Sequence, residues 1–80
     1  MKITCVAIDD EPLALELLTK FIQQTAFLEL VGKFSNAIEA LGFINQNQVQ
    51  LVFMDIQMPG LTGIQFLKSL STSPLVIFIT

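Results

Sequence analysis

The sequence predicts an α/β fold in which helices alternate with the strands of a parallel sheet. Four short apolar runs are typical of strands, and a segment with helical periodicity lies between each pair. Apolar residues follow one another within the runs, which indicates strands buried on both faces, as in parallel sheets. Hydrophobic residues make up 52% of the 80 positions and charged residues 14%, which fits a sheet covered by helices on both sides.

The expected elements come in the order βαβαβαβ. They are strands over residues 3–8, 28–32, 50–54 and 75–79, and helices beginning at Pro12, after Asn36 and after Thr62, the first ending near Thr25. Proline suits a first helical turn, where its missing N–H would have no partner. Asn36 and Thr62 are each followed three residues later by Glu or Gln, the pattern of a capping box.

Apolar spacing also predicts the buried face of each helix. These faces are Ala14, Leu17, Leu18, Phe21 and Ile22 in the first helix, Ile38, Leu41 and Ile44 in the second, and Ile64, Leu67 and Leu70 in the third. The single cysteine, Cys5, lies in the first apolar strand, so we expect a buried, unreactive thiol.

Charge and composition exclude several classes of function. Seven acidic residues against four lysines, with no arginine or histidine, give a net charge of −3, so we expect no nucleic-acid binding by this segment. The start of the chain lacks the long apolar region of a signal peptide, and no run is long enough to cross a membrane. These features predict a cytoplasmic protein that does not bind membranes.

Three aspartates follow two of the strands. Asp9 and Asp10 come directly after the first strand and Asp55 after the third. Ligands of open parallel sheets bind at the carboxyl ends of the strands, where these acids would converge. Oxygen donors without histidine or cysteine favour Mg²⁺ or Mn²⁺. The backbone carbonyl of Gln57 and the hydroxyl of Thr80, at the end of the fourth strand, would lie at the same edge.

This arrangement suits phosphoryl transfer to a carboxylate. A carboxylate beside a divalent cation can attack phosphorus and form an aspartyl phosphate. Taken singly, each acid has a simpler interpretation: Asp9 and Asp10 as a helix N-cap and first-turn acid pair, and Asp55 as a turn former. Their joint spacing favours a site.

Three motifs resemble the receiver domain of bacterial two-component response regulators. They are residues 8–12 (IDDEP), 54–63 (MDIQMPGLTG) and 77–80 (IFIT), and the resemblance spans all 80 residues. The first two are most similar to regulators with a LytTR-type DNA-binding domain. The resemblance implies a flavodoxin-like, doubly wound sheet of order 2-1-3-4, truncated before the family's fifth strand.

The resemblance also assigns roles to single residues. It implies that Asp55 is the phosphoacceptor. It also implies a Mg²⁺ site with Asp10 as a direct ligand, Asp9 as a ligand acting largely through water and the Gln57 carbonyl as a further ligand. Thr80 would be the switch hydroxyl, and Pro59 and Gly63 would shape the loop after Asp55. The family's conserved lysine, which pairs with the phosphoryl group, has no counterpart here. Lys68 is no substitute, because it belongs to the third helix.

We therefore expect residues 1–80 to be the N-terminal portion of a receiver. The implied function is to accept a phosphoryl group from a sensor histidine kinase, to dimerise when phosphorylated and to control an output domain beyond this chain, which we expect to bind DNA. Such a domain is regulatory and not an enzyme acting on another substrate. Two alternatives stay open: a phosphorylation-independent dimerisation module, and an aspartyl-phosphate hydrolase of the haloacid dehalogenase kind. The hydrolase would need an acid at the position of Gln57, which is an amide.

Overall fold

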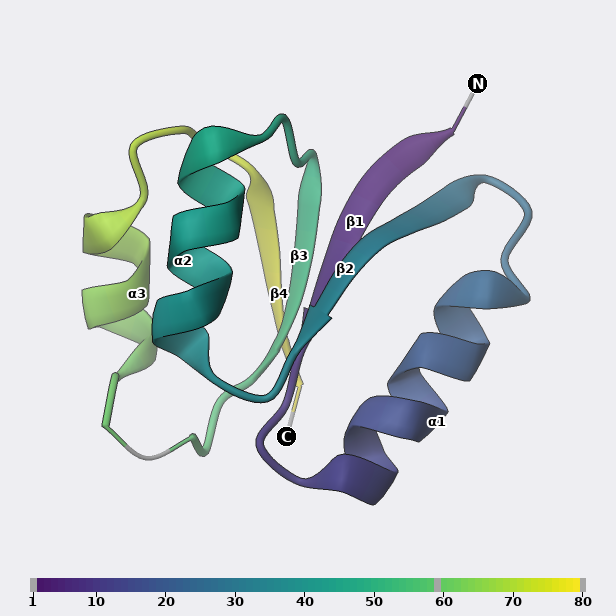
Figure 1. Ribbon diagram of the computed structural model, residues 1–80, viewed down its shortest axis with the longest axis horizontal. Helices are drawn as coiled ribbons and strands as arrows, with labels where there is room; N and C mark the ends of the chain where they lie inside the picture. The colour runs from purple at the N-terminus through teal and green to yellow at the C-terminus, as the bar shows by residue number, and fades with distance from the viewer. Residues whose placement is uncertain (1, 59, 80) are drawn as a thin grey trace.

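A single parallel sheet forms the centre of the protein in a computed structural model that describes residues 2–58 and 60–79 (Figure 1). Its strands are β1 (Ile3–Ile8), β2 (Leu28–Phe34), β3 (Leu51–Asp55) and β4 (Leu75–Ile79), in the order β2-β1-β3-β4. The predicted fold class and strand order are confirmed. Only β2 differs appreciably from its predicted range, since it runs two residues further and ends at Phe34.

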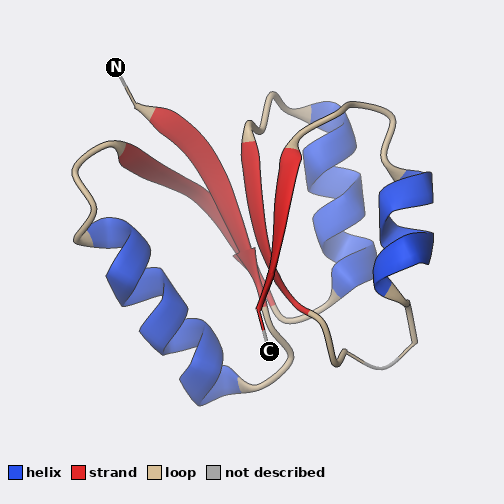
Figure 2. Ribbon diagram, turned by 180° about the vertical axis from the view of Figure 1, so that it is seen from behind, coloured by secondary structure: helices blue, strands red, loops and turns tan. Residues whose placement is uncertain are grey.

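The helices cover both faces of the sheet unequally. They are α1 (Pro12–Gln23), α2 (Ala37–Gln46) and α3 (Gly63–Ser69). In Figure 2, α1 lies alone on one side of the strands, and α2 and α3 lie together on the other. None of the helices in the described residues has the length and apolar character needed to cross a membrane.

Strand β1 supplies side chains to both cores. Its residues alternate between the two faces of the sheet, as strand geometry requires. Val6 and Ile8 belong to the core beneath α2 and α3, whereas Cys5 and Ala7 belong to the core beneath α1. All four are 0% exposed, and the expectation of a buried Cys5 is confirmed. The end of β1 is therefore one of the most firmly packed points of the fold.

Side chains fix where α2 and α3 begin. The side-chain oxygen of Asn36 accepts hydrogen bonds from the backbone N–H groups of Ile38 and Glu39. Thr62 and Gln65 form the full, reciprocal capping box at the start of α3. Both predicted caps are confirmed, although for Asn36 the reciprocal bond to Glu39 is absent from the described residues.

The predicted buried face of α3 is largely wrong. Phe66 is 0% exposed and enters the core, whereas Ile64 and Leu67 are 67% and 45% exposed. Those two line an open hollow of about 400 Å³ that also includes Ile56 and Phe78. The reason is that α3 packs against α2 and the sheet through the face that carries Phe66. The apolar surface of α3 is wider than this face, so part of it stays exposed.

Parts of the predicted faces of α1 and α2 are wrong for the same kind of reason. Helix α1 packs over β1 and β2, so Ile22 is buried while Leu17 and Phe21, which extend past β1, are 58% and 66% exposed. In α2, Ile44 is fully buried but Ile38 is 70% exposed. Periodicity finds an apolar stripe, but the width of the packing partner decides how much of it is covered.

The burial of Phe66 gives a direct test of the corrected α3 face. Truncation by Phe66→Ala should lower the free energy of unfolding by about 3–5 kcal/mol, because it leaves a cavity in a fully buried cluster. Urea unfolding followed by circular dichroism measures the loss. The matched change Ile64→Ala should cost less than about 1 kcal/mol. Equal losses in the two variants would contradict this assignment of the buried face.

Candidate functional site

The three aspartates predicted from the sequence come together at the carboxyl edge of the sheet. Strands β1 and β3 are parallel neighbours with Ile8 opposite Met54, so the residues that follow lie side by side. One carboxylate oxygen from each of Asp9, Asp10 and Asp55 lies within 4.8 Å of the others. Three negative charges therefore occupy one small volume.

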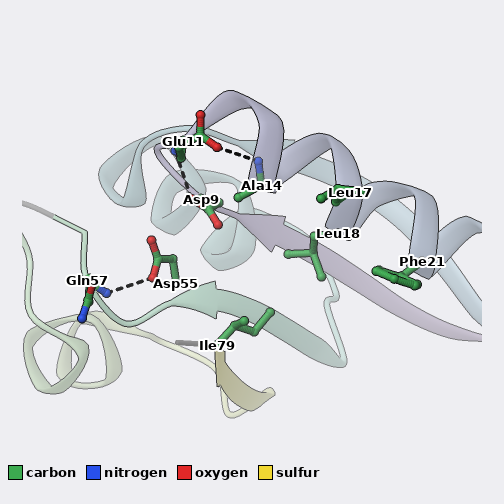
Figure 3. A pocket seen from close by; sticks show the side chains of 9 residues that line it. All are labelled: Asp9, Glu11, Ala14, Leu17, Leu18, Phe21, Asp55, Gln57 and Ile79. Carbon is green, nitrogen blue, oxygen red and sulfur yellow. Dashed lines mark hydrogen bonds between the residues drawn. The ribbon is translucent and has the colours of Figure 1, made fainter.

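Short turns hold two of these carboxylates in place. Oδ1 of Asp9 accepts the backbone N–H of Glu11 at 2.9 Å, and Oδ1 of Asp55 accepts the backbone N–H of Gln57 at 3.0 Å. In Figure 3 the carboxylates of Asp9 and Asp55 face one another across the end of the sheet. Each acid is thus oriented by the loop that follows its own strand, before any ligand is considered.

Glu11 has a structural role that the sequence analysis missed. It occupies the N-cap of α1, and its Oε2 accepts the backbone N–H of Ala14 at 2.9 Å. The simpler interpretation of Asp9 and Asp10 as the helix cap is therefore wrong. The position of Glu11 directly before Pro12 was the available signal, but glutamate is not among the preferred N-cap residues. Because Glu11 caps α1, the two aspartates face the cluster instead.

Electrostatics make the cluster unfavourable on its own. Burial raises the pKa of Asp9, which is only 8% exposed. The Glu11 N–H opposes this rise, while the negative charges of Asp55, Asp10 and Glu11 add to it. A bound cation would relieve both the repulsion and the cost of burial, since an opposite charge favours the ionised form.

The donors suit a hard divalent cation. The cluster contains only carboxylate oxygens, and Asp10 is exposed, so one side of it is open to solvent. Gln57, two residues after Asp55, lies beside the cluster in a hollow of about 480 Å³. Mg²⁺ and Mn²⁺ prefer such oxygen ligands, and Mg²⁺ keeps several waters when few carboxylates are available.

Glycines shape the loop that follows Asp55. Gly60 has φ = 89°, a left-handed conformation that glycine adopts without strain. Gly63 begins α3, and a Cβ atom there would lie 3.0 Å from two ring atoms of Phe78. A larger residue at position 63 would displace that ring. The other predicted loop residue, Pro59, and the predicted switch residue, Thr80, lie outside the described residues.

A family model of the response regulator receiver domain matches residues 5–80. The chain belongs to this family. The resemblance to the receiver domain of response regulators is thereby confirmed, and this domain is of a regulatory class.

Relatives and solved structures agree with this assignment. An uncharacterized response regulatory protein of Shewanella oneidensis is 45% identical over 80 residues, and the transcriptional regulatory protein BtsR of Escherichia coli K12 is 38% identical. In both cases 98% of this chain is covered but only 34% of the relative, so the chain spans about a third of their length. The response regulatory domain of mrkE from Klebsiella pneumoniae superposes with a TM-score of 0.80 at 28% identity, covering 95% of this chain and 65% of that domain. The flavodoxin-like receiver fold is thus confirmed.

The raised pKa of Asp9 predicts a pH-dependent effect of its removal. The folded protein holds this proton more tightly than the unfolded chain, so Asp9 favours folding most below its ordinary pKa. That contribution is lost as the pH rises through the raised value. In metal-free buffer, Asp9→Asn should therefore increase the free energy of unfolding more at pH 7 than at pH 4, as measured by urea titration with a chelator.

The control for this prediction is Glu16→Gln, which removes one negative charge from the exposed surface of α1. If both variants gained the same stability at both values of pH, the repulsive cluster around Asp9 would not be the cause.

Proposed function

We propose that this receiver accepts a phosphoryl group on Asp55 from the phosphohistidine of a sensor histidine kinase. The observation that carries the proposal is the convergence of three carboxylates within 4.8 Å at the end of β1 and β3. Asp55 is the residue of this cluster that ends β3, and its orientation is fixed by the Gln57 N–H. A nucleophile held in place avoids part of the entropic cost of reaction.

Mg²⁺, or Mn²⁺, is the proposed cofactor. Asp10 and Asp55 would bind it directly, Asp9 largely through water, and Gln57 through its backbone carbonyl. When bound, the ion supplies positive charge against the transferring phosphoryl group. The support is the purely oxygen donor set and the unfavourable charge cluster, which a divalent cation would neutralise.

The proposed reaction is a transfer between two protein side chains. A carboxylate oxygen of Asp55 attacks phosphorus, and its O–P bond forms as the N–P bond of the phosphohistidine breaks. The electrons of the broken bond return to the imidazole nitrogen, which takes up a proton from solvent. Later attack by water would release inorganic phosphate and restore the Asp55 carboxylate. The receiver would promote both steps on itself only.

We further propose that phosphorylation controls transcription through an output domain. The support is that BtsR, 38% identical to this chain, is a transcriptional regulatory protein. Thr80 would report phosphorylation as the switch hydroxyl, Pro59 and Gly63 would shape the loop next to Asp55, and phosphorylation would favour a homodimer. DNA would be bound outside residues 1–80, by a domain of the LytTR type, because this segment carries a net charge of −3.

Residues 1–80 are proposed to be the N-terminal portion of the receiver domain. The structural match covers 95% of this chain but only 65% of the mrkE regulatory domain. This difference supports the proposal that the receiver domain is longer than these residues. The lysine that pairs with the phosphoryl group in this family would then follow Thr80.

Phosphorylation at Asp55 can be measured directly on the full-length regulator. Incubation with acetyl phosphate and Mg²⁺ should add one phosphoryl group, detected by intact-mass spectrometry, and Asp55→Asn should abolish the addition because an amide is not an adequate nucleophile. Glu11→Gln, which keeps an oxygen for the helix cap, should still be labelled. A label that persists in Asp55→Asn would refute the assignment of the phosphoacceptor.

Metal binding gives a separate test that does not depend on phosphorylation. Asp10→Asn should weaken Mg²⁺ binding at least tenfold in isothermal titration calorimetry, because it removes a proposed charged ligand from the exposed side of the cluster. The control Glu16→Gln changes the net charge equally but lies on the surface of α1. Equal Mg²⁺ affinity of Asp10→Asn and the unmodified protein would contradict the proposed ligand set.

A further inference from the structure

Strand β2 contains one extra residue in its pairing with β1. Leu30 lies opposite Cys5, and Gly32 lies opposite Val6, the next residue of β1. Val31 is therefore an extra residue between two paired positions, as in a β-bulge. Because side chains alternate between the faces of a strand, an extra residue changes the face on which the following side chains lie. The second half of β2 thus faces the opposite core from Leu30.

The residues after the bulge bring the end of β2 to Asp9. Phe34 lies opposite Ile8, and its backbone carbonyl accepts the N–H of Asp9 at 3.1 Å. Figure 1 shows β2 ending beside β1, where the chain turns towards α1. The carboxylate of Asp9 is held separately, since its Oδ1 accepts the N–H of Glu11. The backbone of Asp9 is thus fixed by β2, and its side chain by the loop before α1.

The ring of Phe34 lies close to the place that a side chain on Gly32 would occupy. A Cβ atom at position 32 would lie 2.9 Å from a ring carbon of Phe34 and 3.4 Å from a ring carbon of Phe43. These two rings also pack against each other, with their centroids 5.4 Å apart. Since Phe43 belongs to α2, the Phe34 ring is confined between that helix and the backbone of Gly32. A larger residue at position 32 must therefore displace the ring of the residue whose carbonyl holds Asp9.

We propose that Gly32 is a positioning residue for the metal site and acts on Asp9 through Phe34. This inference rests on the proposed role of Asp9 as a Mg²⁺ ligand. With no side chain on Gly32, the end of β2 packs closely enough for the Phe34 carbonyl to hold the Asp9 N–H. One carboxylate oxygen of Asp9 then stays within 4.8 Å of oxygens from Asp10 and Asp55. Removing a group that holds a metal ligand in place typically lowers metal affinity by about 10–100-fold.

Mg²⁺ titration of the full-length regulator tests the proposal. Gly32→Ala should weaken Mg²⁺ binding about tenfold in isothermal titration calorimetry, because the displaced Phe34 ring shifts the carbonyl that holds Asp9. The matched control is Gly42→Ala, which makes the same chemical change in α2, where a Cβ atom would meet nothing within 4 Å among the described residues. It should leave the affinity unchanged. Adding Phe34→Leu to Gly32→Ala should restore most of the affinity, because leucine lacks the ring atoms that the new Cβ meets.

Amide hydrogen exchange in metal-free buffer separates positioning from general stability. The N–H of Asp9 should exchange about tenfold faster in Gly32→Ala, because its bond to the Phe34 carbonyl is weakened. The N–H of Ile56, which donates to the carbonyl of Ile79 at 3.0 Å, follows the end of β3 and should keep its rate. Both amides lie at strand ends, where exchange proceeds by local opening. A difference between them therefore reports the local effect on Asp9.

Three results would overturn the positioning role. They are equal Mg²⁺ affinity of Gly32→Ala and the unmodified regulator, a double variant that binds Mg²⁺ no better than Gly32→Ala, and equally faster exchange at Asp9 and Ile56. In the last case Gly32 would only stabilise the fold as a whole. An unmodified regulator that binds no Mg²⁺ would instead refute the proposed metal site, and the exchange rate of the Asp9 amide would still decide whether Gly32 positions this residue.

Discussion

The parallel pairing of β1 with β3 is the constraint on which the site depends. With Ile8 opposite Met54, the chain leaves both strands at the same level, so that Asp9 and Asp55 become neighbours. The register of this pairing is fixed because β1 is buried on both faces. Its alternate side chains, which differ in size, belong to two different cores. A slip of one residue would shift Asp9 by about 3.3 Å and exchange the residues of the two cores. Core packing therefore sets the geometry of the acids.

The cluster of three aspartates lowers the stability of the folded chain while it gathers oxygen donors at one point. The fold places three carboxylates where their charges repel one another and where burial raises the pKa of Asp9. The backbone N–H groups of Glu11 and Gln57 hold two of the acids without supplying a full counter-charge. An opposite charge beside these carboxylates would favour their ionised form and reduce the repulsion between them. The same repulsion that costs stability thus favours a divalent ion.

The strands, the caps of α2 and α3 and the acid cluster could be predicted from the sequence, because each follows from a local sequence pattern. Apolar runs indicate strands, Asn36 and Thr62 are preferred caps, and parallel strands bring their carboxyl ends together, so the acid cluster follows from the order of elements. The cap formed by Glu11 was missed because glutamate is a rare N-cap. The predictions of the buried helix faces were partly wrong for a different reason. Burial depends on how much of the sheet each helix covers, and periodicity carries no information about that.

The exposed side chains that were wrongly predicted to be buried line different hollows. Leu17 and Phe21 line a hollow with Ile79, and Ile64 and Leu67 line one with Phe78. All four therefore border β4, whose Ile77 is itself 45% exposed, and they suit further packing against the sheet. Ile38 lines a different hollow, together with Asp10. Helix α2 turns Ala37, Ala40 and Ile44 into the core, so Ile38 lies on the part of its surface that the fold leaves exposed.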